Sequence, residues 1–124
     1  MANILVLDDV LDAVNLIRKI LRRKGHEVFT FTEEEEAITF AASHSVDLAI
    51  LDIKLKKMSG TEVLQELKKK NPGIHVIMLT GYPSLETARE ALSLGAEEYC
   101  VKPIEKEELE GKVEAILGAA QTKE

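Results

Sequence analysis

The 124-residue sequence has one cysteine, Cys100, no tryptophan and only three prolines. A single cysteine excludes an intramolecular disulfide framework and is typical of a reducing compartment. No apolar run approaches the roughly 20 residues that span a bilayer. The apolar start of the chain lacks the basic residues of a signal peptide, and we interpret it as a first strand. We therefore expect a cytoplasmic globular protein that does not enter a membrane.

The chain also has fewer basic residues than acidic ones. The chain has 22 acidic residues against 16 lysines and arginines, a net charge of −6. Because nucleic-acid binding favours a basic surface, we do not expect direct nucleic-acid binding by this chain. Three short basic runs lie on predicted helices, and we interpret them as solvated helix faces. They are Arg18-Lys19, Arg22-Arg23-Lys24 and Lys68-Lys69-Lys70.

Short apolar runs alternate with stretches of helical periodicity along the whole chain. The run over 48–51 is apolar throughout, as in a strand that is buried on both faces. Five strands that alternate with five helices predict an α/β fold with a parallel sheet and right-handed crossovers. We expect the strands over residues 4–7, 28–31, 48–51, 75–79 and 99–101.

Capping signals predict where several helices begin. Thr32 with Glu35 and Ser59 with Glu62 each match a capping box, and Ser84 can cap a third helix. The last helix is expected over 105–117. The domain is expected over residues 1–118, with 119–124 as a tail or the start of a linker. The first helix is expected to present four apolar residues at helical spacing: Val10, Val14, Ile17 and Leu21.

Polar residues follow four of the five predicted strands. Asp8 and Asp9 follow the first strand, Asp52 the third, Thr80 the fourth and Lys102 the fifth. In open α/β sheets, ligands bind beyond the carboxyl ends of the strands. We therefore expect these five side chains at one edge of the sheet.

Three of these residues are carboxylates, which would repel one another in a shared pocket. A hard cation removes that conflict, and Mg²⁺ (or Mn²⁺) commonly takes one or two carboxylates together with water and phosphate oxygens. We therefore predict a metal site formed by Asp8, Asp9 and Asp52. The alternative for Asp8 and Asp9 is compensation of the dipole at the start of the first helix.

Asp52 is also the best candidate nucleophile. A carboxylate can attack phosphorus and form an acyl phosphate, a reaction that depends on positioning and charge neutralisation. Lys102 offers a compact positive charge for a phosphate oxygen, and the Thr80 hydroxyl can donate a hydrogen bond to another. The alternatives are an exposed lysine at a strand end and an ordinary turn threonine.

With these motifs in this order, the sequence resembles the receiver domain of two-component response regulators over nearly its whole length. The resemblance implies a flavodoxin-like (βα)5 three-layer sandwich with the sheet order 2-1-3-4-5. The matching segments are Leu7-Asp8-Asp9, Leu51-Asp52, Met58-Ser59-Gly60, Leu79-Thr80-Gly81, Gly95-Ala96 and Tyr99-Cys100-Val101-Lys102-Pro103.

The resemblance also implies a signalling switch. Asp52 would accept a phosphoryl group from a sensor histidine kinase or a phosphotransfer protein. The backbone carbonyl of Lys54 would join the three aspartates as a metal ligand. Thr80 and Lys102 would contact the phosphoryl group, and Pro103 would follow a cis peptide bond.

The expected output involves a conserved type of movement in this family. Thr80 would move toward the phosphate, and Tyr99 would swing inward into the vacated space. This movement would change the face made by the fourth helix, the fifth strand and the fifth helix, which would bind a downstream effector or a second receiver. Exposed candidates on this face are Glu86, Arg89, Glu90, Tyr99, Lys106 and Glu110.

Two positions depart from the receiver pattern. Many receivers carry proline four residues after the phospho-acceptor, where this chain has Lys56, so we expect a more mobile loop after the third strand. Val10 replaces a residue that is often polar. We also hypothesise that Lys54 and Tyr82 flank the site entrance and shield the phosphoryl group from water.

Three other functions compete with this interpretation. A phosphatase that uses an aspartyl phosphate would need a general acid two residues after Asp52, where Lys54 stands. A pseudo-receiver that binds partners without phosphate would not need the full polar set. A flavin carrier would need a phosphate loop in place of Asp8 and Asp9. We therefore expect no enzyme activity beyond the chain's own phosphorylation and dephosphorylation.

Overall fold

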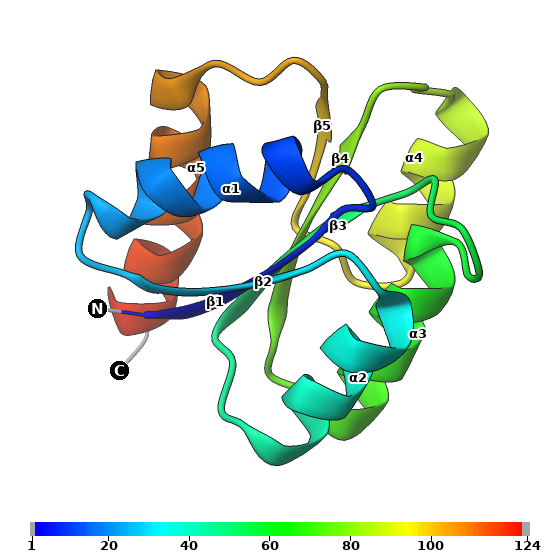
Figure 1. Ribbon diagram of the computed structural model, residues 1–124, viewed down its shortest axis with the longest axis horizontal. Coiled ribbons are helices and arrows are strands. Elements are labelled where there is room, and N and C mark those ends of the chain that lie inside the picture. Colours follow the sequence, from blue (N-terminus) through cyan, green and yellow to red (C-terminus); the bar gives the residue numbers. More distant parts are fainter. Residues whose placement is uncertain (1, 123–124) are drawn as a thin grey trace.

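Five parallel strands form one sheet in the order β2-β1-β3-β4-β5 in the computed structural model, which describes residues 2–122 (Figure 1). This order confirms the expected flavodoxin-like fold. The strands are β1 (Asn3–Leu7), β2 (Glu27–Phe31), β3 (Leu48–Asp52), β4 (His75–Thr80) and β5 (Glu98–Val101). The helices are α1 (Leu11–Arg22), α2 (Glu34–Ser43), α3 (Gly60–Lys70), α4 (Leu85–Ser93) and α5 (Lys106–Thr122).

Helices cover both faces of the sheet. Helices α1 and α5 lie on one face, and α2, α3 and α4 lie on the other (Figure 1). The apolar side chains accordingly form two clusters, one for each face, which is why β3 is buried at all five positions. Among the described residues, no helix is both long and apolar enough to cross a membrane.

Two of the three predicted caps are present. The Glu62 N–H donates to Ser59 Oγ at 3.2 Å, and the Ser59 N–H donates to Glu62 Oε1 at 3.0 Å, so the capping box of α3 is complete. Ser84 Oγ accepts the Thr87 N–H at 3.1 Å at the start of α4. The β3–α3 and β4–α4 loops therefore end at fixed points.

The predicted Thr32–Glu35 cap is wrong. Helix α2 begins at Glu34, and its N-cap is Glu33, whose side chain makes no capping bond. The helix thus begins one residue later than a Thr32 cap requires. Its first residue, Glu34, is buried and directs its carboxylate toward a neighbouring loop, whereas Glu35 is exposed.

The placement of Val10 within the first helix is also wrong. Val10 is the extended N-cap of α1, and its side chain is 53% exposed. Its N–H donates to Asp8 Oδ1 at 2.9 Å, which holds the residue outside the helix. Val14, Ile17 and Leu21 are buried as expected.

The last helix is longer than the pattern predicted. Helix α5 continues to Thr122, into the segment expected as a tail, while residues 123 and 124 lie outside the described part of the chain. Two glycines follow helix ends with positive φ, Gly25 at 90° and Gly95 at 105°. Both positions favour glycine because other residues adopt this conformation at a cost.

Candidate functional site

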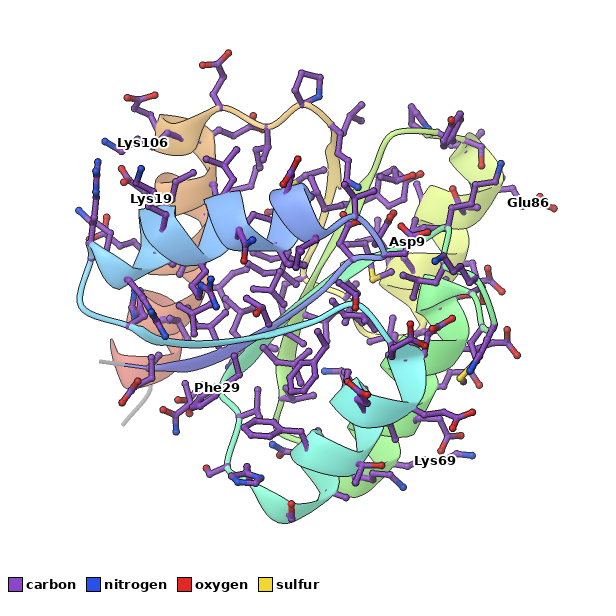
Figure 2. All side chains as sticks on the ribbon, in the orientation of Figure 1. Asp9, Lys19, Phe29, Lys69, Glu86 and Lys106 are labelled. Atoms are coloured by element: carbon purple, nitrogen blue, oxygen red, sulfur yellow. The ribbon has the colours of Figure 1, made fainter. Side chains whose placement is uncertain are left out.

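The carboxyl ends of the strands bring the predicted polar residues to one edge of the sheet. The parallel register pairs Leu7 with Leu51 and Asp52 with Leu79, so Asp8 and Asp52 emerge at the same level. Figure 2 shows Asp9 in the loop between β1 and α1, at this edge. The sheet geometry therefore gathers side chains that are far apart in the sequence.

Three carboxylates converge there. Oxygens of Asp8, Asp9 and Asp52 all lie within 4.8 Å of one another. Asp8 is 2% exposed and Asp52 is 7% exposed, whereas Asp9 is half-buried beside the opening. This set of close oxygen donors has the chemistry that Mg²⁺ or Mn²⁺ prefers, so the residues fit a hard divalent cation.

Lys102 lies against two of these carboxylates. Its Nζ is 2.5 Å from Asp8 Oδ2 and 3.3 Å from Asp52 Oδ2. Its backbone N–H donates to the carbonyl oxygen of Thr80 at 2.7 Å, which fixes the end of β5 beside β4. The following peptide bond, Lys102–Pro103, is cis, as the resemblance implied.

Burial and neighbouring charges shift the pKa values of Asp52 and Lys102. Burial raises the pKa of Asp52 above its ordinary value, the charge of Asp8 raises this pKa further, and Lys102 partly opposes both. Burial alone would lower the pKa of Lys102, but the hydrogen bond and charge of Asp8, together with the charge of Asp52, raise it. Added positive charge at this site would therefore favour ionised Asp52.

A cleft of about 460 Å³ opens over Asp52. Lys54 and Tyr82 line this cleft, and Lys54 Nζ lies 4.5 Å from the centroid of the Tyr82 ring. The Lys54 N–H donates to Asp52 Oδ1 at 3.3 Å. The two residues predicted to flank the entrance are thus in contact with each other through a cation–π interaction.

Thr80 also lies at this edge of the sheet, but its hydroxyl binds a different partner. Its side chain is buried, and its Oγ1 accepts the Tyr82 N–H at 3.0 Å. Within residues 2–122, no hydrogen bond joins the Thr80 hydroxyl to Asp52 or Lys102. Lys102 therefore contacts Asp8 and Asp52 directly, whereas the Thr80 hydroxyl is not hydrogen-bonded to this group in the described residues.

Tyr99 is half-buried and bound to α4. Its hydroxyl lies 2.7 Å from Thr87 Oγ1 and accepts the Ser84 N–H at 3.2 Å. Glu110 is likewise half-buried, while the other candidates on this face are exposed. Glu86 and Lys106 point outward from α4 and α5 (Figure 2).

Sequence reasoning missed Glu34, a buried carboxylate near the site loop. Glu34 Oε2 accepts the N–H of Lys57 at 2.5 Å and that of Met58 at 3.0 Å. Burial alone would raise the pKa of Glu34, but these two hydrogen bonds hold it below its ordinary value. Glu34 is one of four consecutive glutamates, so its sequence context does not distinguish it.

The histidines lie away from this edge. His75 pairs with Glu97 at the amino end of β4, and His26 Nδ1 accepts the Ala2 N–H at 3.3 Å. His44 is the exposed C-cap of α2. Cys100 is a free thiol buried in the core.

Known proteins match this chain over most of its length. The family model described as "Response regulator receiver domain" matches residues 4–114. A response regulator receiver domain protein (CheY-like) from Methanospirillum hungatei JF-1 superposes with a TM-score of 0.96 at 33% identity, covering 100% of this chain and 99% of that one. A receiver domain protein from Clostridium thermocellum superposes with a TM-score of 0.91 at 33% identity, with both chains covered in full.

Longer proteins contain similar segments. "Probable transcriptional regulator ycf27" of Cyanidium caldarium is 38% identical over 118 residues, which cover 92% of this chain and 47% of that protein. "Transcriptional regulatory protein ZraR" of Escherichia coli K12 is 34% identical over 115 residues, or 93% of this chain and 26% of that protein. The chain thus spans half or less of the length of these relatives, and it belongs to the response regulator receiver domain family.

Proposed function

We propose that this chain is a phosphorylation-dependent switch that accepts a phosphoryl group on Asp52. Receiver domains act in two-component signalling with histidine kinases and effectors. The observation that carries the proposal is the position of Asp52: buried, within 4.8 Å of the other two carboxylates of the cluster, and 3.3 Å from the Lys102 ammonium.

The donor in this proposal is a phosphohistidine of a sensor histidine kinase or phosphotransfer protein. An Asp52 oxygen forms a bond to phosphorus while the bond from phosphorus to the imidazole nitrogen breaks. The products are an aspartyl phosphate and a histidine that takes up a proton. Such a transfer needs alignment and charge stabilisation more than acid–base chemistry, because little covalent chemistry falls to the protein.

The surrounding residues supply that stabilisation. Lys102 is placed to shift from the carboxylates toward a phosphoryl oxygen. Asp8, Asp9, Asp52 and the backbone carbonyl of Lys54 would hold Mg²⁺, or Mn²⁺ in its place. The bound cation would neutralise charge on the phosphoryl oxygens. Without it, burial and Asp8 disfavour the ionised form of Asp52 that must attack.

Phosphorylation would then act on α4 and β5. The new group adds about −1.5 to −2 charges and strong acceptor oxygens. Thr80 would rotate its hydroxyl toward this group, and the Tyr82 N–H that it now binds would move with it. The Tyr99 hydroxyl is hydrogen-bonded to the start of α4. A shift of the β4–α4 loop would therefore change the face made by α4, β5 and α5. That face would bind an effector or a second receiver.

The proposal is tested with a small phosphodonor. Purified chain is incubated with acetyl phosphate and Mg²⁺, and its intact mass is measured. We expect a gain of one phosphoryl group that disappears with a chelator and in Asp52→Asn, and that persists in Asp12→Asn, an exposed aspartate of α1. No gain in the wild-type chain would favour the pseudo-receiver alternative, and steady turnover of an aryl phosphate would favour the phosphatase.

A further inference from the structure

We infer that Glu34 is a positioning residue for the metal and phosphoryl site. Its carboxylate, at the start of α2, holds the β3–α3 loop (residues 53–59), which follows the proposed phospho-acceptor. The inference deepens the proposed function and rests on it wherever metal binding is concerned.

The contact is specific and buried. Glu34 is 2% exposed, and one oxygen, Oε2, accepts two consecutive backbone N–H groups, those of Lys57 and Met58. Hydrogen bonds to a charged acceptor are roughly twice as strong as neutral ones. The carboxylate also lies in the first turn of α2, where the helix dipole favours negative charge. The ionised form is therefore stabilised from two sides.

Within the described residues, the other hydrogen bonds of the loop backbone lie at its ends, while Leu55 and Met58 pack their side chains against the core. The Gly60 N–H donates to the Ile53 carbonyl oxygen at 2.7 Å, and the Lys54 N–H donates to Asp52 Oδ1 at 3.3 Å. Neither bond restrains the middle of the loop. Glu34 provides the hydrogen bonds to the backbone between these ends, so it helps to set the path of the chain between Lys54 and the α3 cap.

The sequence lacks one restraint that many receivers have in this loop. A proline four residues after Asp52 would restrict the loop backbone, but this chain has the exposed residue Lys56 there. Without that restriction, the loop needs another source of order. The ion pair between Lys57 and Glu33 is 3.9 Å long and exposed, and such pairs contribute little. The buried hydrogen bonds of Glu34 therefore contribute more to the order of the loop than this ion pair does.

The consequence concerns the Lys54 carbonyl. A backbone ligand can contribute to metal affinity only if the loop presents it in the right place before the ion arrives. Outer groups that orient ligands in this way are often worth 10–100-fold in affinity. Because Glu34 acts three residues away from Lys54, we expect its effect at the lower end, roughly tenfold.

The test compares Glu34→Ala with the matched variant Glu35→Ala, which changes an exposed neighbour on α2. Amide hydrogen exchange is measured without metal, and the Mg²⁺ Kd is measured by calorimetry. In Glu34→Ala, exchange at the Lys57 and Met58 amides should rise about tenfold or more, and the Kd should rise roughly tenfold. Glu35→Ala should change neither. If Glu34→Ala does not fold, Glu34→Gln keeps one acceptor oxygen and should give smaller changes of the same sign.

Two results would overturn the inference. One is unchanged exchange at Lys57 and Met58 in a folded Glu34 variant. The other is faster exchange with an unchanged Mg²⁺ Kd, because Glu34 would then support the loop without serving the site. Absence of Mg²⁺ binding by the wild-type chain would instead overturn the proposed function and the metal part of this inference, and amide exchange would still decide whether Glu34 holds the loop.

Discussion

Asp52 is constrained by two opposing requirements. As the proposed phospho-acceptor it would gain from burial, which strengthens interactions with phosphate, yet burial and Asp8 both raise its pKa and disfavour its charge. Lys102 resolves part of this conflict by contacting both carboxylates. Three carboxylates and one ammonium leave the site with a net negative charge. This remaining charge makes the site suited to a divalent cation.

The first prediction concerns the entrance to the cleft. Lys54 and Tyr82 contact each other beside Asp52, so their loss should admit water to an aspartyl phosphate. We expect the double variant Lys54→Ala/Tyr82→Ala to lose its phosphoryl group several times faster than wild type, as followed by intact mass after removal of the donor. Lys57→Ala, an exposed lysine of the same loop, is the control. Equal rates in all three proteins would refute the shielding role.

At the scale of elements, the α2 helix is tied to the β3–α3 loop through Glu34, and this tie depends on pH. The folded pKa of Glu34 lies below its unfolded value of about 4.5. The unfolded state therefore binds more protons between these two values, so stability falls as pH drops through the folded pKa. Above the unfolded value, the contribution is fully present.

We predict that Glu34→Gln lowers the free energy of unfolding by about 1–2 kcal/mol at pH 7, because hydrogen bonds to a charged acceptor become neutral ones. The difference from wild type should shrink as pH falls below about 4.5. Urea unfolding at several pH values measures both quantities. A difference that stays constant down to pH 3 would show that the charge of Glu34 does not matter.

The backbone is closely packed at the junction between β3 and α3. A Cβ atom on Gly60 would lie 2.1 Å from the Asp52 carbonyl oxygen, closer than any real contact. Gly60→Ala should therefore destabilise the fold by about 3 kcal/mol or more. Gly111 in α5 has no neighbouring atom within 4 Å of such a Cβ, so Gly111→Ala should stabilise by about 0.5–1 kcal/mol. Thermal unfolding distinguishes the two, and similar effects would contradict this account.

Capping shows how far the sequence predicts these elements. Ser59 with Glu62 and Thr32 with Glu35 have the same pattern, yet only the first forms a capping box. The difference arises from tertiary contacts, because α2 begins where Glu34 can reach the loop amides. Val10 departs from the expectation for a local reason, since the Asp8 side chain two residues earlier accepts its N–H and holds it outside the helix. The spacing of apolar residues alone reveals neither contact.

At the scale of the whole molecule, the alternation of apolar runs and helical periods was sufficient to predict a parallel sheet, whereas the strand order and the three layers were predicted from the resemblance to receiver domains. The parallel topology then places Asp8, Asp9, Asp52 and Lys102 at one edge, so most of the site could be predicted from strand ends. The orientation of Thr80 could not, because it depends on the turn that presents the Tyr82 N–H.

The α4-β5-α5 face gives a fourth prediction. The Tyr99 hydroxyl binds both Thr87 and the Ser84 N–H, so Thr87→Val should remove the first of these bonds while keeping the shape of the side chain. We expect a loss of about 1 kcal/mol of stability and altered NMR shifts for Tyr99 and the first turn of α4 before any phosphorylation. Thr39→Val, at an exposed position of α2, should leave those signals unchanged. Unaltered Tyr99 signals in Thr87→Val would contradict the link.

The central claim is that Asp52 receives a phosphoryl group inside a cation-binding site, and one structure tests it most directly. Crystals grown with Mg²⁺ and beryllofluoride, a mimic of the phosphoryl group, should show beryllium bonded to an Asp52 oxygen. Lys102 and Thr80 should contact the fluorides, and Mg²⁺ should lie among Asp8, Asp9 and the Lys54 carbonyl. Beryllofluoride on another carboxylate, or a Mg²⁺ ion bound away from these residues, would contradict the account.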